Sequence, residues 1–249
     1  MIINNKEIYD ANWASWVDAK IYGPTGRWLR YLLSQLFTGI PEPQNIASIL
    51  DFGCGEGTNT YFLAQCFPQA RVTGLDFSQT GIDCARSQYQ RDNLEFLVGG
   101  LDSPRLGGRH DLIACLEVLE HVGPWQDLLA RLALAARQYL LLSFPTGRMR
   151  NYEKNVGHVR NFHQGQVENF LSGLGFQPLK IFYAGFPFYS PGYREWCNLI
   201  NAAHHPLTRG KFGPLQHAAS TILFILFKYF STRDRGGDQF CGLFKKRVS

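Results

Sequence analysis

The feature that most constrains the fold is an apolar segment, residues 46–52, which leads straight into the glycine-rich turn Gly53-Cys54-Gly55-Glu56-Gly57. Glycines at alternate positions let the backbone turn sharply and approach a ligand closely. A second apolar segment, residues 71–76, ends in Asp76, nineteen residues after Gly57, where an acid can bind the two hydroxyls of a ribose. The pattern predicts a strand, a turn, a helix and a second strand that together hold a nucleoside.

The charge of this turn indicates which nucleoside it favours. Asp51 precedes the glycines and Glu56 lies among them. A pyrophosphate needs bare backbone amides and would be repelled by two carboxylates, whereas a ligand with a sulfonium and an ammonium would be attracted. The third glycine of a dinucleotide-binding turn would also fall on Thr58. The turn therefore favours a cationic nucleoside. A NAD-dependent oxidoreductase of Rossmann type and a purely structural turn are the alternatives.

The remaining apolar segments alternate with helix-like patterns, which is typical of a mostly parallel sheet covered by helices. Pro178 lies inside one of these segments, and because proline cannot donate to a β-ladder, we expect that strand at the sheet edge. An amphipathic helix with Trp28, Leu32 and Leu36 on one face is expected before the sheet, after a break at residues 22–26. The expected strands are 46–52, 71–76, 94–98, 111–116, 139–144, 176–182 and 239–245.

A single domain accounts for all 249 residues. We divide it into N-terminal cap helices (1–45), a cofactor-binding core (46–182), a lid insertion (183–237), and a final strand with a basic tail (238–249). Aromatic residues crowd the cap and the start of the insertion, which predicts an aromatic-rich lid suited to a partly apolar acceptor. Ordinary packing explains any single ring equally well. These rings are Tyr9, Trp13, Trp16, Tyr22 and Trp28, and then Tyr183, Phe186, Phe188, Tyr189, Tyr193 and Trp196.

Composition indicates a cellular compartment and narrows the classes of binding partner. The start of the chain is polar, and the six cysteines form no CxxC pair, which indicates a cytoplasmic protein with reduced, mostly buried thiols. A net charge of +5 without a basic stripe interleaved with aromatics argues against a nucleic-acid partner. The apolar stretch 218–230, with Lys228 inside it and Arg233 and Arg235 after it, fits either a buried helix or peripheral contact with a membrane surface.

Five segments together resemble the class I S-adenosylmethionine-dependent methyltransferases, although no single one is specific: 49–57, 72–78, 111–122, 157–160 and 173–176. The resemblance implies an α/β, Rossmann-like, seven-stranded and mostly parallel sheet whose last strand is antiparallel, with helices on both faces. It also implies S-adenosylmethionine as cofactor.

The resemblance assigns the cofactor-binding residues as well. Asp51, Gly53, Cys54 and Gly55 would face its methionine part, Asp76 would hold the ribose hydroxyls, and Phe77 would flank the adenine. The family usually has an acid near the adenine after the third strand, but this chain has Val98-Gly99-Gly100-Leu101 there, with Asp102 two positions late. We therefore assign that contact to the backbone of Leu101.

Candidate catalytic residues follow the fourth and fifth expected strands, because open α/β sheets bind ligands beyond the carboxyl ends of their strands. Glu117, Glu120 and His121 are spaced to share one face of a helix, and His158 lies on the next such loop. Histidine suits proton removal near neutral pH, so His158 is the first candidate for the general base and His121 the second. Glu117 is expected to contact the cofactor or orient His121. A loop histidine bonded to the backbone is an equal alternative for His158.

The same residues leave metal dependence open. Glu-x-x-Glu-His resembles the metal-ligating set of some magnesium- or manganese-dependent members of the superfamily, and His158 could be a fourth ligand. Acidic residues at a helix start are also ordinary for electrostatic reasons.

The expected function is in-line methyl transfer from S-adenosylmethionine to a small-molecule, glycan or lipid-linked acceptor. The glycan or lipid-linked class is suggested by a subgroup that shares Tyr22-Gly23-Pro24, 157–160 and 185–190. A membrane-surface module that keeps a vestigial cofactor fold is the non-enzymatic alternative.

Overall fold

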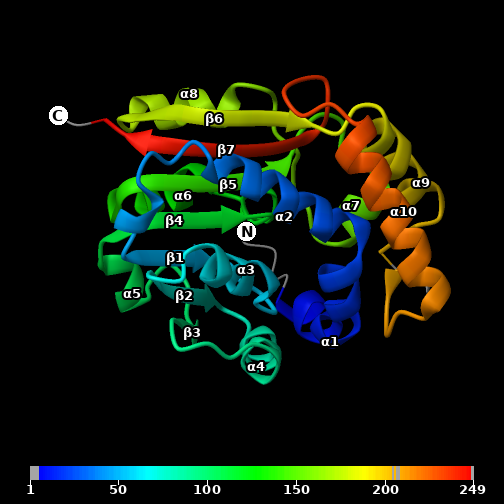
Figure 1. Cartoon of the computed structure of the whole chain (residues 1–249), viewed down its shortest axis with the longest axis horizontal. Coiled ribbons are helices and arrows are strands. Elements are labelled where there is room, and N and C mark those ends of the chain that lie inside the picture. The colour runs from blue at the N-terminus through cyan, green and yellow to red at the C-terminus, as the bar shows by residue number, and fades with distance from the viewer. Residues whose placement is uncertain (1–5, 204, 206–207, 248–249) are drawn as a thin grey trace.

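A seven-stranded sheet forms the centre of the computed structural model, which describes residues 6–203, 205 and 208–247 (Figure 1). The strand order is β3-β2-β1-β4-β5-β7-β6. Neighbouring strands from β3 to β5 are parallel, and β7 is antiparallel to both β5 and β6. The predicted mostly parallel sheet with an antiparallel last strand is confirmed. The strands are β1 (Ser48–Phe52), β2 (Arg71–Asp76), β3 (Leu94–Val98), β4 (His110–Leu116), β5 (Ala136–Pro145), β6 (Phe176–Ala184) and β7 (Gln239–Lys246).

Helices cover both faces of the sheet, as predicted. Successive residues of β4 show why: Leu112 and Ala114 belong to one buried cluster, whereas Ile113 and Cys115 belong to the other. The first cluster includes the apolar faces of α2 (Pro24–Phe37) and α3 (Thr58–Cys66), and the second includes those of α6 (Trp125–Ala135) and α8 (Gln166–Gly173). The other helical elements are α1 (Lys6–Tyr22), η1 (Pro43–Asn45), α4 (Gln79–Gln88), α5 (Pro104–Gly107), η2 (Leu119–His121), α7 (Asn151–Asn155), η3 (Phe188–Tyr193), α9 (Arg194–Leu199) and α10 (Pro214–Phe230).

Proline positions agree with the structure at two places. Strand β6 lies at the sheet edge, and its pairing with β7 is irregular between Pro178 and Lys180, because Pro178 has no N–H to donate. The helix predicted around Trp28 is α2, which has Pro24 in its first turn. The break before it is shorter than predicted and is confined to the junction of Tyr22 and Gly23.

The segment after β6 forms the insertion, built from η3, α9 and α10. Helix α10 lies against α2, where the Phe227 and Trp28 rings meet at 6.3 Å between centroids. In the part of the chain that the structure describes, no helix combines the length and apolar character needed to cross a membrane. The six cysteines are free, and Cys54, Cys115, Cys197 and Cys241 are buried.

The predicted basic tail is not a separate segment. Lys245 pairs with Tyr139 in the sheet, and the Lys246 ammonium donates to the carbonyls of Ala133 and Ala136. This end of β7 lies at the opposite end of the molecule from α10 (Figure 1). The C-terminal cations therefore divide into two groups that are far apart in space.

Candidate functional site

The glycine turn after β1 adopts backbone angles that only glycine takes without strain. Gly53, Gly55 and Gly57 have φ of +77°, +54° and +84°. A Cβ on Gly53 would lie 2.5 Å from Cγ2 of Val118, and one on Gly57 would lie 2.7 Å from Cε1 of Phe96. A Cβ on Gly55 would instead lie 2.5 Å from Cη2 of Trp13. The protein's own side chains therefore pack closely against all three glycines, and α1 occupies the space over Gly55.

Helix α1 is fastened over this turn through Ser78. The Trp13 indole Nε1 donates to Oγ of Ser78 at 3.1 Å, and the same hydroxyl donates to the carboxylate of Asp10. Ser78 also accepts the backbone N–H of Gly81 at 2.9 Å and thereby caps α4. Sequence reasoning placed Trp13 in a lid but did not identify its contact with Gly55, because no pattern in the sequence connects residues so far apart.

Three buried carboxylates surround the turn. Asp51 accepts a hydrogen bond from the Thr60 hydroxyl at 2.7 Å, and Asp76 accepts the backbone N–H groups of Gly55 and Ser78, each at 2.8 Å. Glu56 is the third, and at most 5% of each of the three residues is exposed. Among the described residues, no lysine or arginine forms an ion pair with any of them.

Burial of these acids shifts their protonation. Desolvation raises the pKa of Asp51 to about 7, and the neighbouring charges of Asp76 and Glu56 act in the same direction. Burial also raises the pKa of Asp76, opposed by its two backbone hydrogen bonds. The Arg30 guanidinium is a cation near this site, and burial lowers its pKa overall although the charge of Glu56 acts to raise it. A cationic ligand would supply further positive charge beside Asp51 and Asp76. The residues present therefore fit S-adenosylmethionine, and Asp51, Gly53, Gly55 and Asp76 lie together as predicted.

The other predicted cofactor residues lie near the same strand ends. Cys54 is buried within the turn, and Phe77, directly after Asp76, is 47% exposed. Leu101 packs against the second core cluster. The Asp102 side chain is fully exposed and pairs with Arg131 at 3.6 Å, so it is accounted for without a ligand.

The predicted helix carrying Glu117, Glu120 and His121 is wrong. Glu117 follows β4 directly with a φ of 57°, and η2 is a three-residue 3₁₀ turn, so the three side chains share no α-helical face. The Glu117 carboxylate accepts a hydrogen bond from the Gln239 amide at 2.9 Å, and that amide oxygen accepts one from the Tyr189 hydroxyl at 3.0 Å. Glu117 is thus held by Gln239 of β7 and, through it, by Tyr189 of η3.

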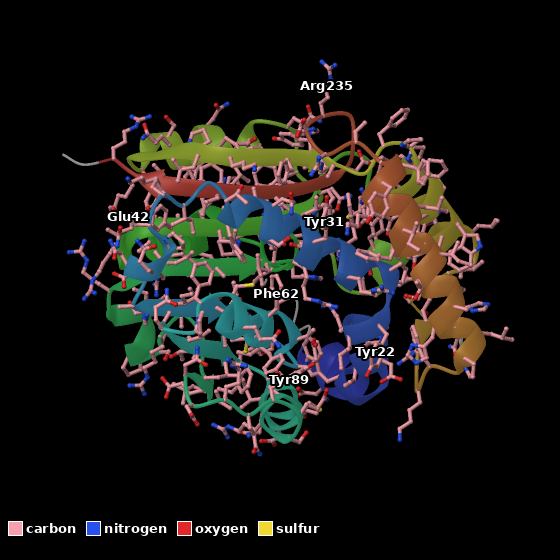
Figure 2. All side chains as sticks on the ribbon, in the orientation of Figure 1. Tyr22, Tyr31, Glu42, Phe62, Tyr89 and Arg235 are labelled. Atoms are coloured by element: carbon pink, nitrogen blue, oxygen red, sulfur yellow. The ribbon has the colours of Figure 1, made fainter. Side chains whose placement is uncertain are left out.

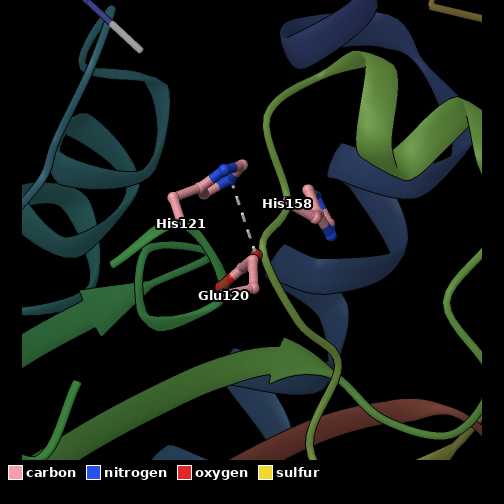
Figure 3. Close-up of side chains that lie close together, drawn as sticks. All are labelled: Glu120, His121 and His158. Carbon is pink, nitrogen blue, oxygen red and sulfur yellow. Dashed lines mark ion pairs between the residues drawn. The ribbon is translucent and has the colours of Figure 1, made fainter. Parts of the chain in front are cut away.

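Glu120, His121 and His158 form a compact cluster at the ends of β4 and β5 (Figure 3). The His121 and His158 rings are perpendicular with centroids 4.6 Å apart, and Nε2 of His121 lies 3.9 Å from Oε1 of Glu120. Glu120 is fully buried, and neither of its carboxylate oxygens has a hydrogen-bond partner. The structure therefore brings together Glu120, His121 and His158, three members of the set that the sequence offered for catalysis or a metal.

Burial controls the charge of this cluster. It lowers the pKa of His121 to about 3 and that of His158 to about 4, with the charge of His158 also acting on His121. Burial and the neighbouring Glu117 raise the pKa of Glu120 well above its usual range. Both imidazoles are neutral at pH 7, so each can accept a proton. Potential ligand atoms of the three residues lie within 4.8 Å of one another, so the cluster could also hold a divalent cation.

A buried ionic network fixes the loop that carries His158. The backbone N–H of His158 donates to the carbonyl of Glu153 at 3.0 Å. The Glu153 carboxylate pairs with Arg194 of α9, whose guanidinium also lies 3.2 Å from Asp238. Arg194 and Glu153 are 1% and 2% exposed at their side chains. No pattern in the sequence indicates this network, because Glu153, Arg194 and Asp238 lie more than forty residues apart from one another.

Comparison with known proteins shows that this chain is similar to methyltransferases. The sequence profile of a family described as a methyltransferase domain matches residues 49–138. Trans-aconitate 2-methyltransferase of Paracidovorax citrulli is 34% identical over 47% of this chain and 46% of its own length. The mitochondrial ubiquinone biosynthesis O-methyltransferase of Schizosaccharomyces pombe is 28% identical over 64% of this chain and 69% of its own length.

Solved structures show the same fold. Magnesium protoporphyrin IX methyltransferase from Synechocystis, with bound S-adenosylhomocysteine, has a TM-score of 0.56 at 17% identity, covering 93% of this chain and 88% of that one. The match to the first relative above spans less than half of that protein's length.

Proposed function

We propose that the chain is a class I S-adenosylmethionine-dependent methyltransferase, which its family match and its relatives support, and that it transfers the methyl group of S-adenosylmethionine to a small-molecule or lipid-linked acceptor. The observation that carries the proposal is the set of buried carboxylates Asp51, Glu56 and Asp76 around the glycine turn, none of which forms an ion pair with a lysine or arginine in the described residues. The names of the two relatives support a small acceptor, since they refer to trans-aconitate and to O-methylation in ubiquinone biosynthesis.

The chain's residues would divide the work between binding and proton removal. The cofactor supplies an electrophilic methyl group on a positively charged sulfur. Asp76 would accept hydrogen bonds from the ribose hydroxyls, and Asp51 would balance the positive charge of the methionine part. His158 would take the proton that an acceptor hydroxyl or amine loses as its oxygen or nitrogen bonds to the methyl carbon, and the C–S bond electrons would remain on sulfur. Positioning of the two reactants supplies most of the remaining acceleration.

The neutral state of His158 is compatible with this role. With its pKa lowered to about 4, the imidazole is unprotonated at pH 7 but weakly basic, so it would accept the proton only as the acceptor's own proton becomes acidic in the transition state. Its Nδ1 has no hydrogen-bond partner. His121, directly beside it, is the second candidate.

Cofactor binding is tested first. We expect S-adenosylhomocysteine to bind in calorimetry and NADH to give no heat, because the three acids would repel a pyrophosphate. Asp76→Ala should abolish the binding, and Asp83→Ala, at an exposed acid on α4, is the matched control. Tight NADH binding would favour the oxidoreductase. Binding of neither compound would favour a module with a vestigial cofactor fold.

The transfer step needs an acceptor, which radiolabelled cofactor can reveal. The enzyme is incubated with methyl-labelled S-adenosylmethionine and separate aqueous and lipid extracts of cells, and labelled products are identified by mass spectrometry. With the acceptor in hand, His158→Ala should lose at least a hundredfold in kcat. His163→Ala, at an exposed histidine of the same loop, should retain activity. A His158→Ala activity within a few-fold of wild type would exclude the base role.

A metal-dependent reaction is the second candidate, favoured by the Glu120 carboxylate that lacks any hydrogen-bond partner. Two neutral imidazoles and a carboxylate are suitable ligands for a divalent cation. Dialysis against EDTA separates the two proposals. Loss of activity that Mn²⁺ or Mg²⁺ restores would support the metal, whereas unchanged activity supports His158 as a base acting without one.

A further inference from the structure

The lid carries an apolar stripe that faces away from the protein. Along α10, Leu215, Ile222, Ile225, Tyr229 and Phe230 are 86%, 60%, 43%, 66% and 61% exposed. Four of them, from Leu215 to Tyr229, recur at intervals of seven, three and four residues, which places them on one side of a helix. The opposite side contains the buried Ser220 and Phe227. Large side chains exposed in a continuous row on one helix mark an interaction surface.

The stripe continues onto the neighbouring turn. Phe188 of η3 is 41% exposed, and its ring lies 6.4 Å from that of Phe230. Helix α10 forms the outer edge of the molecule, beyond α2 and away from the sheet (Figure 1). We call the five exposed α10 residues and Phe188 the lid patch.

Cations line one long edge of the lid patch. The Arg27 guanidinium lies over the Phe224 ring at 4.4 Å and donates to the Thr221 hydroxyl. The Lys228 ammonium lies 5.2 Å from the ring of Tyr31, and Arg233 donates to the Tyr31 hydroxyl (Tyr31 is labelled in Figure 2). All three therefore lie where α2 and α10 meet.

Acidic residues are scarce on this side. Neither α2 nor α10 contains an aspartate or a glutamate. The acids that flank the two helices in sequence are Asp234, next to Arg233, Asp18, whose carboxylate accepts the N–H of Phe212, and Glu42, which Figure 2 shows at the far end of α2 from α10. Figure 2 shows Arg235 projecting outward from the same loop as Asp234. The edge of the lid patch thus carries a net positive charge.

We propose that α10 lies flat on a membrane that contains anionic lipid, with the lid patch in the boundary between headgroups and acyl chains. A helix of 17 residues is about 25 Å long, and its apolar stripe could enter that boundary along its whole length. Arg27, Lys228 and Arg233 would extend their charged ends to lipid phosphates while their alkyl parts stay on apolar surface. The one-sided positive charge favours an anionic lipid surface over a second copy of this chain, whose lid would repel the first. Membrane binding is a property separate from methyl transfer, and it can be measured without knowing the methyl acceptor.

Sedimentation with vesicles tests the proposal on the full chain. Vesicles of phosphatidylcholine alone are compared with vesicles that also contain phosphatidylglycerol. We expect the wild-type protein to pellet with the anionic vesicles and to be released by high salt. Ile222→Asp combined with Ile225→Asp should lower the bound fraction at least tenfold. Lys228→Gln combined with Arg233→Gln should remove the preference for phosphatidylglycerol.

Leu134→Asp is the matched control, because Leu134 is a 74% exposed leucine on α6, outside the lid patch. It should bind vesicles as the wild type does, and circular dichroism melting should show that all variants are folded. The proposal is overturned if the wild type stays in the supernatant, or if Leu134→Asp loses binding as strongly as the α10 variant. It is also overturned if ultracentrifugation shows a dimer that the Ile222→Asp and Ile225→Asp changes dissociate, since the lid patch would then be a self-interface.

Discussion

Replacing Asp51 by asparagine measures how much the ionisation of this buried carboxyl lowers the stability of the folded protein. Asparagine keeps the size of the side chain and an oxygen that can accept the Thr60 hydroxyl, but it cannot ionise. Burial raises the pKa of Asp51 from 3.8 to about 7. A carboxyl with a raised pKa binds its proton more tightly in the folded state, so its contribution to stability is lost as the pH rises from about 3.8 through 7. Asp51 is 1% exposed, so solvent screens this cost little.

The magnitude follows from the two pKa values. Between pH 5 and pH 8, ionisation of Asp51 should lower the free energy of unfolding by about 2–3 kcal/mol. Asp51→Asn removes this loss. The variant should therefore gain about 2–3 kcal/mol relative to wild type between pH 5 and pH 8.

Urea unfolding of both proteins at pH 5 and pH 8 measures the effect. Shifts from His121 and His158 are common to both proteins and cancel in the difference. Asp83→Asn, at an exposed position on α4, is the control and should change nothing. If the wild type and Asp51→Asn show the same dependence on pH, then burial does not perturb Asp51 and the electrostatic argument for a cationic ligand fails.

The same carboxyl should couple to cofactor binding. A positively charged ligand beside Asp51 lowers the pKa of that carboxyl, so binding of S-adenosylmethionine at pH 7 should release protons. Calorimetry in buffers with different ionisation enthalpies measures this release. Asp51→Asn should release fewer protons and bind more weakly.

Three further outcomes are expected. Burial lowers the pKa of His121 to about 3 and that of His158 to about 4, so their ring proton resonances should not move between pH 5.5 and pH 8. The two histidines should reduce the free energy of unfolding only as the pH falls below about 6.5, where they become protonated in the unfolded chain. A titration near 6.5 in the folded protein would contradict the burial argument. Arg194→Met leaves Glu153 buried without its cation and should lower the free energy of unfolding by about 3–5 kcal/mol, which lowers the Tm by about 6–20 °C in a thermal melt. A change in Tm within error would mean that the network does not contribute to stability. Gly55→Ala places a methyl group 2.5 Å from the Trp13 ring and should displace α1. Limited trypsin digestion would detect this displacement as faster cleavage after Lys20. Unchanged cleavage would contradict the contact between Trp13 and Gly55.

Most of the sheet could be predicted because buried parallel strands have a strong local signature. The strands ending in Phe52 and Asp76 are apolar runs followed by glycine or an acid, and both end where the sequence predicted. Pro178 identified the edge strand for a simple chemical reason, its missing N–H. Helix boundaries were less certain: Ala136 continues the apolar period of α6, yet it is the first residue of β5, because the chain passes from helix to strand without a loop.

The site was predictable where a simple rule of sheet geometry brings residues together. The glycine turn and Asp76 meet because adjacent parallel strands end at the same edge. Glu117 was misplaced because its left-handed backbone cannot be read from its residue type, since a positive φ is uncommon for glutamate. Partners such as Gln239 for Glu117 depend on the final strand returning to β5, which sequence spacing does not encode.

The contact between Trp13 and Gly55 has a consequence for the timing of the reaction cycle. In the proposed function the cofactor would contact Gly55, which an indole ring covers, so α1 would have to lift for the cofactor to enter and again for its product to leave. With an acceptor that reacts quickly, this opening would set the upper limit of kcat, as lid motions do in many enzymes. Turnover would then respond to viscosity and to changes at Ser78 and Asp10, which hold the helix down, although neither residue takes part in the chemistry.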